Sequence, residues 1–186
     1  MTYDSTFDTQ SHIVQVRNLM FFMIHNLLLR SHDHDYSKLE DPEKAIFDEF
    51  TPKLKGLTYN SPEYKQALLD IGPALEHHYA KNHHHPEHFR EVADPEIDEI
   101  KAYLEDLSVN DPAHAWLTSY RNELESRVNG MSLLDVLEML ADWKAAGMRH
   151  ADGNLATSLE INHKRFKISD QLQQILINTA KELGWL

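Results

Sequence analysis

The chain has 186 residues, a formal net charge of −12 at pH 7 and no cysteine. This length fits one compact domain, the lack of cysteine excludes disulfide bonds and thiolate metal sites, and the negative charge argues against binding to duplex DNA. No segment approaches the roughly 18 consecutive apolar residues that cross a bilayer, and the acidic N-terminal segment does not resemble a signal peptide. We therefore predict a single cytoplasmic domain, residues 1–186, without a membrane partner.

The predicted secondary structure is helical from end to end, with hardly any of the alternation that marks a strand. Residues 9–31 are apolar on every side, which is typical of a central core helix rather than of a surface helix. Further helices are indicated where an N-cap residue precedes a proline, at Asp41-Pro42, Ser61-Pro62, Asp94-Pro95 and Asp111-Pro112. The sequence therefore predicts an all-α fold.

Other helix boundaries follow from capping and helix-breaking residues. They are a kink at Gly72-Pro73, a capping box of Ser132 and Asp135 that opens a helix to about Met148, and a last helix that Ser169 opens and that stops before Gly184.

Histidine is concentrated in two segments. Six histidines fall within residues 77–88, in the stretch HHYAKNHHHPEH, and an earlier cluster, SHDHDYSK, occupies residues 31–38. Imidazole is the commonest metal ligand in proteins, and without thiolates the remaining ligands have to be Asp and Glu. The sequence therefore predicts one or two divalent ions, with Mn, Fe, Co, Mg and Zn as the candidates.

Polar residues also interrupt two apolar segments. Asp135, Glu138 and Asp142 are spaced to share one face of a helix that is otherwise apolar. That face is either an ordinary solvated stripe or, as the apolar neighbours of Asp142 favour, a buried one that needs a cation or a metal. His25, within FFMIHNLLL, is either a hydrogen-bonded core histidine or a metal ligand.

In this order, His25, His34-Asp35 and Asp142 resemble the H…HD…D signature of the HD-domain superfamily of metal-dependent phosphohydrolases. A closer resemblance is to small, uncharacterised bacterial and phage proteins whose pattern joins HDxSK, a histidine, NxHH and EMxxDW. In this chain the elements are His34 to Lys38, His78, Asn82 with His84-His85, and Glu138-Met139 with Asp142-Trp143. The resemblance implies an HD-domain-like helical bundle.

The resemblance also implies a ligand set. His25, His34, Asp35 and Asp142 would bind a primary ion, and His78, His84 and His85 would hold a second ion that Asp35 bridges. The alternative is that some of these histidines only orient ligands or cap turns. For His77, His83 and His88 we expect that lesser role, and for His32 and Asp33 we expect a solvated position or contacts to the ligating side chains.

The predicted chemistry is attack on phosphorus by hydroxide that the metal generates from bound water. The candidate catalytic residues are Asp35, Lys38 and Glu138, and the candidate substrate-binding residues are Arg17, Lys38 and Asn82. Lys38 is alternatively a surface lysine, Arg17 a member of an ion pair, and Glu138 a carboxylate that holds a ligating histidine. We expect a nucleotide or another small phosphate ester as substrate.

Two other functions remain open: a di-iron oxygenase on an HD-type scaffold, for which the histidine-rich ligand supply is equally suitable, and a non-catalytic, metal-stabilised module that binds a nucleotide or a partner. Residues 90–130, rich in Asp and Glu, carry two of the predicted helices and lengthen the connection between the HHH and EMxxDW segments. We interpret them as an inserted helical pair that serves as a lid, as decoration or as the contact of a homo-oligomer.

Overall fold

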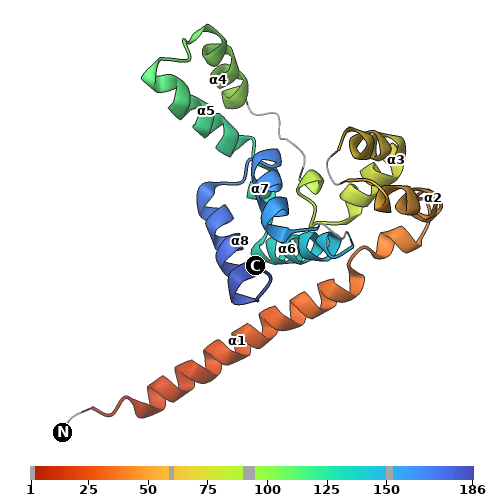
Figure 1. The fold of residues 1–186 in the computed structure, drawn as a ribbon. Helices are drawn as coiled ribbons and strands as arrows, with labels where there is room; N and C mark the ends of the chain where they lie inside the picture. Colours follow the sequence, from red (N-terminus) through yellow and green to blue (C-terminus); the bar gives the residue numbers. More distant parts are fainter. Residues whose placement is uncertain (1–2, 59–60, 90–94, 150–152) are drawn as a thin grey trace. The chain divides into compact units, whose positions relative to one another are not determined.

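The computed structural model describes residues 3–58, 61–89, 95–149 and 153–186. Every regular element in these ranges is a helix, which confirms the predicted all-α fold class (Figure 1). The chain divides into two compact units, Met1–Tyr36 and Ser37–Leu186. The first unit consists mainly of the long N-terminal helix, and the single domain predicted from the sequence over residues 1–186 stays a prediction.

Helix α1, Thr6–Asp33, is the helix predicted over residues 9–31, but none of its residues is buried. Apolar side chains such as Leu19, Phe22 and Leu28 are more than half exposed. The prediction of a core position is therefore not met, because a single helix has no second element within its unit to cover its apolar faces. Among the described residues, no helix combines the length and the hydropathy that a bilayer span requires.

The second unit contains seven α-helices within the described ranges, joined by short segments that include 3₁₀ turns. They are α2 (Glu43–Lys55), α3 (Pro62–Lys81), α4 (Pro95–Asp106), α5 (Pro112–Leu124), α6 (Leu133–Gly147), α7 (Leu155–Arg165) and α8 (Asp170–Glu182), with the 3₁₀ turns η2 (Pro86–His88) and η3 (Arg127–Gly130). A further 3₁₀ turn, η1 (Tyr36–Leu39), begins at the last residue of the first unit. Helices α4 and α5 pack against each other and confirm the helical pair predicted within residues 90–130.

The helix starts follow the capping residues predicted from the sequence. Ser61 caps α3 by accepting a hydrogen bond from the backbone N–H of Tyr64, and Asp111 does the same for Ala113 at the start of α5. Ser169 caps α8, which ends before Gly184 in the left-handed conformation. Helix α2 begins at Glu43, one residue later than predicted, and Asp94 lies outside the described residues.

Helix α3 is kinked where Gly72-Pro73 predicted a break. Gly72 has φ 14° and ψ −85°, which lie outside the helical region, and Pro73 cannot donate a backbone hydrogen bond across the kink. The segment that follows the kink carries His77 and His78, so the break sets the direction in which the last turns of α3 present these two histidines.

The core of the second unit is formed by α6, α7 and α8. Met139 and Leu140 of α6, Leu159 of α7 and Leu176 of α8 are almost completely buried there. Packing on this core fixes one face of α6, and the opposite polar positions of α6 are thereby held in place.

The capping box that opens α6 gives a first testable prediction. Ser132 Oγ accepts a hydrogen bond from the backbone N–H of Asp135, and Asp135 Oδ2 accepts one from the backbone N–H of Ser132. Ser132→Ala is expected to lower the free energy of unfolding by about 1 kcal/mol, as measured by urea denaturation. Ser119→Ala, at an exposed position inside α5, is the matched control and should cause no loss because alanine favours a helix interior. Equal losses in the two variants would contradict the role of the cap.

Candidate metal centre

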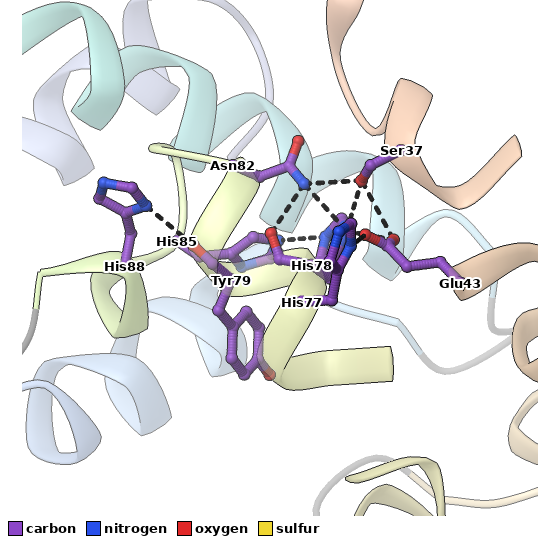
Figure 2. A network of polar contacts seen from close by, with 8 residues as sticks. All are labelled: Ser37, Glu43, His77, His78, Tyr79, Asn82, His85 and His88. Atoms are coloured by element: carbon purple, nitrogen blue, oxygen red, sulfur yellow. Dashed lines mark hydrogen bonds and ion pairs between the residues drawn. The ribbon is translucent and has the colours of Figure 1, made fainter. Parts of the chain in front are cut away.

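Three histidines meet at the end of α3 and in the loop that follows it. Nitrogen atoms of His78, His84 and His85 all lie within 4.8 Å of one another. Figure 2 shows His78 and His85, whose Nε2 atoms are 2.9 Å apart. His78 lies on α3, whereas His84 and His85 precede η2. We call these three residues the histidine trio.

The spacing within the histidine trio fits a bound ion. Two nitrogen ligands that bind one ion at about 2.1 Å and at right angles are about 3 Å apart. The 2.9 Å between the Nε2 atoms of His78 and His85 is close to this separation. The Nε2 atoms of these two rings are therefore spaced as two ligands of one divalent ion would be.

Glu43, the first residue of α2, contacts His78 at Nδ1, the ring nitrogen that does not face His85. Its side chain is 0% exposed; Oε1 lies 2.7 Å from His77 Nδ1, and Oε2 lies 3.0 Å from His78 Nδ1 (Figure 2). Ser37 Oγ donates a hydrogen bond of 3.0 Å to the same Oε2. A buried carboxylate is costly unless it is paired, and here two imidazoles and a hydroxyl surround it.

Asn82 belongs to the same network. Its Nδ2 donates to Ser37 Oγ at 2.9 Å and to the backbone carbonyl oxygen of His78 at 2.8 Å. The side chain is buried, and these contacts hold the loop that begins at Asn82 against the end of α3. The predicted role of Asn82 in substrate binding stays a prediction, while its contacts give it a structural role next to the histidine trio.

Glu138 on α6 faces a second member of the histidine trio. Its Oε1 lies 3.0 Å from Nδ1 of His84, whose side chain is only 2% exposed. This contact agrees with the alternative in which Glu138 holds a ligating histidine. This contact joins the loop after α3 to α6. The capping box and the packed core hold α6 in place, so they also hold Glu138 in position to contact His84.

The acidic face of α6 is not a solvated stripe. Asp135 is buried and used in the helix cap, Glu138 contacts His84, and Asp142 is half-buried. The negative charge of Asp142 also acts on His85, whose pKa it raises against larger opposing effects. The structure thus supports the buried interpretation of this face.

His85 is held in the neutral form. Burial, followed by the neighbouring His84 and His78, lowers the pKa of His85 to about 3, and Lys38 adds a smaller effect in the same direction. A neutral imidazole keeps a lone pair at pH 7, which is the form that binds a metal ion. Lys38 itself is half-buried, with Nζ 5.2 Å from the centre of the Phe47 ring, and its predicted catalytic and substrate-binding roles stay predictions.

Four predicted site residues lie in the first unit. His34 and Asp35 are half-buried neighbours, with His34 Nε2 3.7 Å from Asp35 Oδ2, and Asp35 has a φ of 57°, a left-handed conformation that aspartate tolerates better than most residues. Arg17 and His25 are exposed on α1, and His25 joins no group of candidate ligand atoms among the described residues. The predicted roles of these four residues stay predictions.

The other histidines near the trio have structural contacts, as expected. His77 contacts Glu43, His88 Nδ1 donates to the backbone carbonyl of Tyr79, and the exposed His83 stacks on His88 with ring centres 3.9 Å apart. Sequence reasoning missed Glu43, because a glutamate in the first turn of a helix next to Asp41 and Lys44 has the pattern of a solvated charge. Only its complete burial identifies its role.

Comparison with known proteins gives a family and no function. A family model described as "Family of unknown function (DUF5662)" matches residues 1–182. No curated protein and no solved structure matches the chain. The histidine trio, Glu43 and Glu138 all lie within the matched residues.

Proposed function

The chain belongs to the DUF5662 family, and we propose that it is a metal-dependent phosphohydrolase that acts on a nucleotide or another small phosphate ester. The observation that carries the proposal is the histidine trio, in which Glu43 contacts His78 and Glu138 contacts His84. Histidines whose second nitrogen is bound by a carboxylate are typical of metal ligands, because the carboxylate fixes the ring and raises its basicity.

His78, His84 and His85 would hold the ion, and the sequence resemblance adds His34, Asp35 and Asp142 as further ligands. A divalent ion in such a site supplies hydroxide at neutral pH, since it lowers the pKa of bound water to about 7, and it offsets charge on the phosphoryl oxygens. An open coordination position is needed for this chemistry, and the partial exposure of His85 is consistent with access from solvent.

Lys38 is the residue that we assign to the substrate. Its cationic group lies near enough to His85 to lower the pKa of that imidazole, and a phosphate oxygen next to the ion would therefore meet a positive charge. The net charge of −12 favours a small phosphate ester over a nucleic acid backbone, whose binding depends on many Lys and Arg contacts. Glu138, which contacts His84, is assigned to positioning rather than to proton transfer.

The second candidate function is a di-iron oxygenase. The same observation favours it, because histidine and carboxylate ligands without thiolates suit iron as well as manganese, cobalt or zinc. The two functions differ in what they consume: the hydrolase releases phosphate without oxygen, whereas the oxygenase needs iron and dioxygen.

The test is an activity screen of metal-free protein reloaded separately with Mn, Fe, Co or Zn. Nucleoside mono-, di- and triphosphates are offered, and phosphate release and oxygen consumption are measured in parallel. We expect phosphate release that depends on the added metal and that is lost in His85→Ala but kept in His83→Ala. Oxygen consumption by the iron-loaded protein without phosphate release would favour the oxygenase, and the absence of both phosphate release and oxygen consumption with every metal would contradict both enzymes.

A further inference from the structure

Glu43 is the most deeply buried acid among the described residues, and the proposed reaction does not use it directly. Its carboxylate contacts His77 Nδ1 through Oε1, and His78 Nδ1 and Ser37 Oγ through Oε2 (Figure 2). A carboxylate that is buried to this extent has to accept hydrogen bonds from groups that carry protons. The protons in this network can therefore be assigned.

Besides Glu43, His78 Nδ1 lies 3.0 Å from Asn82 Nδ2 and 3.2 Å from Ser37 Oγ, so its proton is assigned by following where these two groups donate theirs. The backbone oxygen of His78 can only accept, so the Asn82 atom that faces it is the amide nitrogen, which also donates to Ser37 Oγ. Ser37 then donates its own proton to Glu43 Oε2. The carboxylate oxygen at 3.0 Å from His78 Nδ1 requires a proton on that nitrogen, because a lone pair there would face the charged oxygen.

We propose that Glu43 is a positioning residue that holds His78 in the tautomer with its proton on Nδ1, so that Nε2 keeps the lone pair that binds the ion. The tautomer stands on the hydrogen-bond network alone, whereas the part that concerns the ion rests on the proposed function. His77 Nδ1 contacts the other carboxylate oxygen, Oε1, and this second contact helps to fix the orientation of the Glu43 side chain toward His78.

The pairing of Glu138 with His84 is independent support. Glu138 lies on α6, far from Glu43 in the sequence. It contacts Nδ1 of His84, just as Glu43 contacts Nδ1 of His78. Glu43 of α2 and Glu138 of α6 thus occupy the Nδ1 atoms of His78 and His84. The Nε2 atoms of these two histidines are then the nitrogens that would bind an ion. This repetition is expected if the carboxylates serve to select the ligand atom.

The tautomer is measured in the metal-free protein at mildly alkaline pH from long-range proton–nitrogen NMR correlations of isotope-labelled histidine. We expect the wild-type protein to carry the His78 proton on Nδ1. In Glu43→Gln the amide can accept from one neighbour but has to donate to another, and we expect the tautomer of His78 to change or to become mixed. A wild-type spectrum with the His78 proton on Nε2 would overturn the proposal even if Glu43→Gln did not fold.

Glu138→Gln is the matched control, because it should alter the tautomer of His84 and leave that of His78 unchanged. Competition with a chelator then gives the affinity for Mn or Zn, and we expect Glu43→Gln to lower it by about 10- to 100-fold. An unchanged His78 tautomer together with an unchanged metal affinity in folded Glu43→Gln would refute the role of Glu43. A changed tautomer in a protein that binds no metal even as wild type would uphold that role and refute the proposed function.

Discussion

Replacing His85 with alanine is expected to lower the affinity for a divalent metal by at least about a hundredfold. Removal of a carboxylate that only orients a ligand already lowers metal affinity by about 10- to 100-fold, and removal of an imidazole that binds the metal directly should lower it at least as much. His85 is suited to this test because it is half-buried and its Nε2 atom lies 2.9 Å from His78 Nε2, which is the spacing of two nitrogen ligands of one ion. Metal content after dialysis and competition with a chelator measure the effect.

His83→Ala provides the matched control for this variant. His83 is the first residue of the HHH triplet, two positions before His85, but it is exposed and stacks on His88 outside the histidine trio. It should keep the wild-type metal content. If both variants lost metal to the same extent, the ion would be bound by the HHH triplet as a whole and not specifically by the histidine trio.

Removal of the metal is expected to lower the melting temperature by roughly 10 °C. At a free metal concentration about 1,000 times the Kd, binding to the native state alone adds about 4 kcal/mol, and each kcal/mol shifts the melting temperature of a chain of this size by about 2–4 °C. The trio joins the end of α3 to α6 through Glu138, so an ion at this site would stabilise contacts between these elements. Thermal denaturation with and without a chelator, followed by readdition of the metal, measures the shift.

The His85→Ala variant is also the control for this second prediction. It should show little further decrease in melting temperature when the chelator is added, because its site is already weak. A chelator effect of the same size in the wild-type protein and in this variant would show that the stabilising metal is bound elsewhere.

The helix boundaries could be predicted from the sequence because capping is local. Ser61 and Asp111 accept hydrogen bonds from backbone groups two or three residues away, and Gly72 breaks α3 through its own backbone conformation. The surroundings of α1 could not be predicted in this way. An all-round apolar pattern shows that a helix favours burial, but it does not specify which element covers it.

The candidate site could be predicted in part for the same reason. Histidine clusters are conspicuous in any sequence, and the spacing of Glu138 and Asp142 places them on one face of α6. The contacts that orient the histidines depend on pairs far apart in the chain: Glu43 with His78, and His84 with Glu138. Nothing near Glu43 in the sequence distinguishes it from an ordinary charged residue at a helix start.

The most direct test of the metal centre is anomalous diffraction from crystals of the wild-type protein grown with manganese or iron. We expect a peak in the anomalous map at about 2.1 Å from ring nitrogens of His78, His84 and His85, with Glu43 and Glu138 on the opposite nitrogens of His78 and His84. A fully loaded crystal whose peak lies away from the histidine trio, or whose trio nitrogens contact no metal, would contradict it.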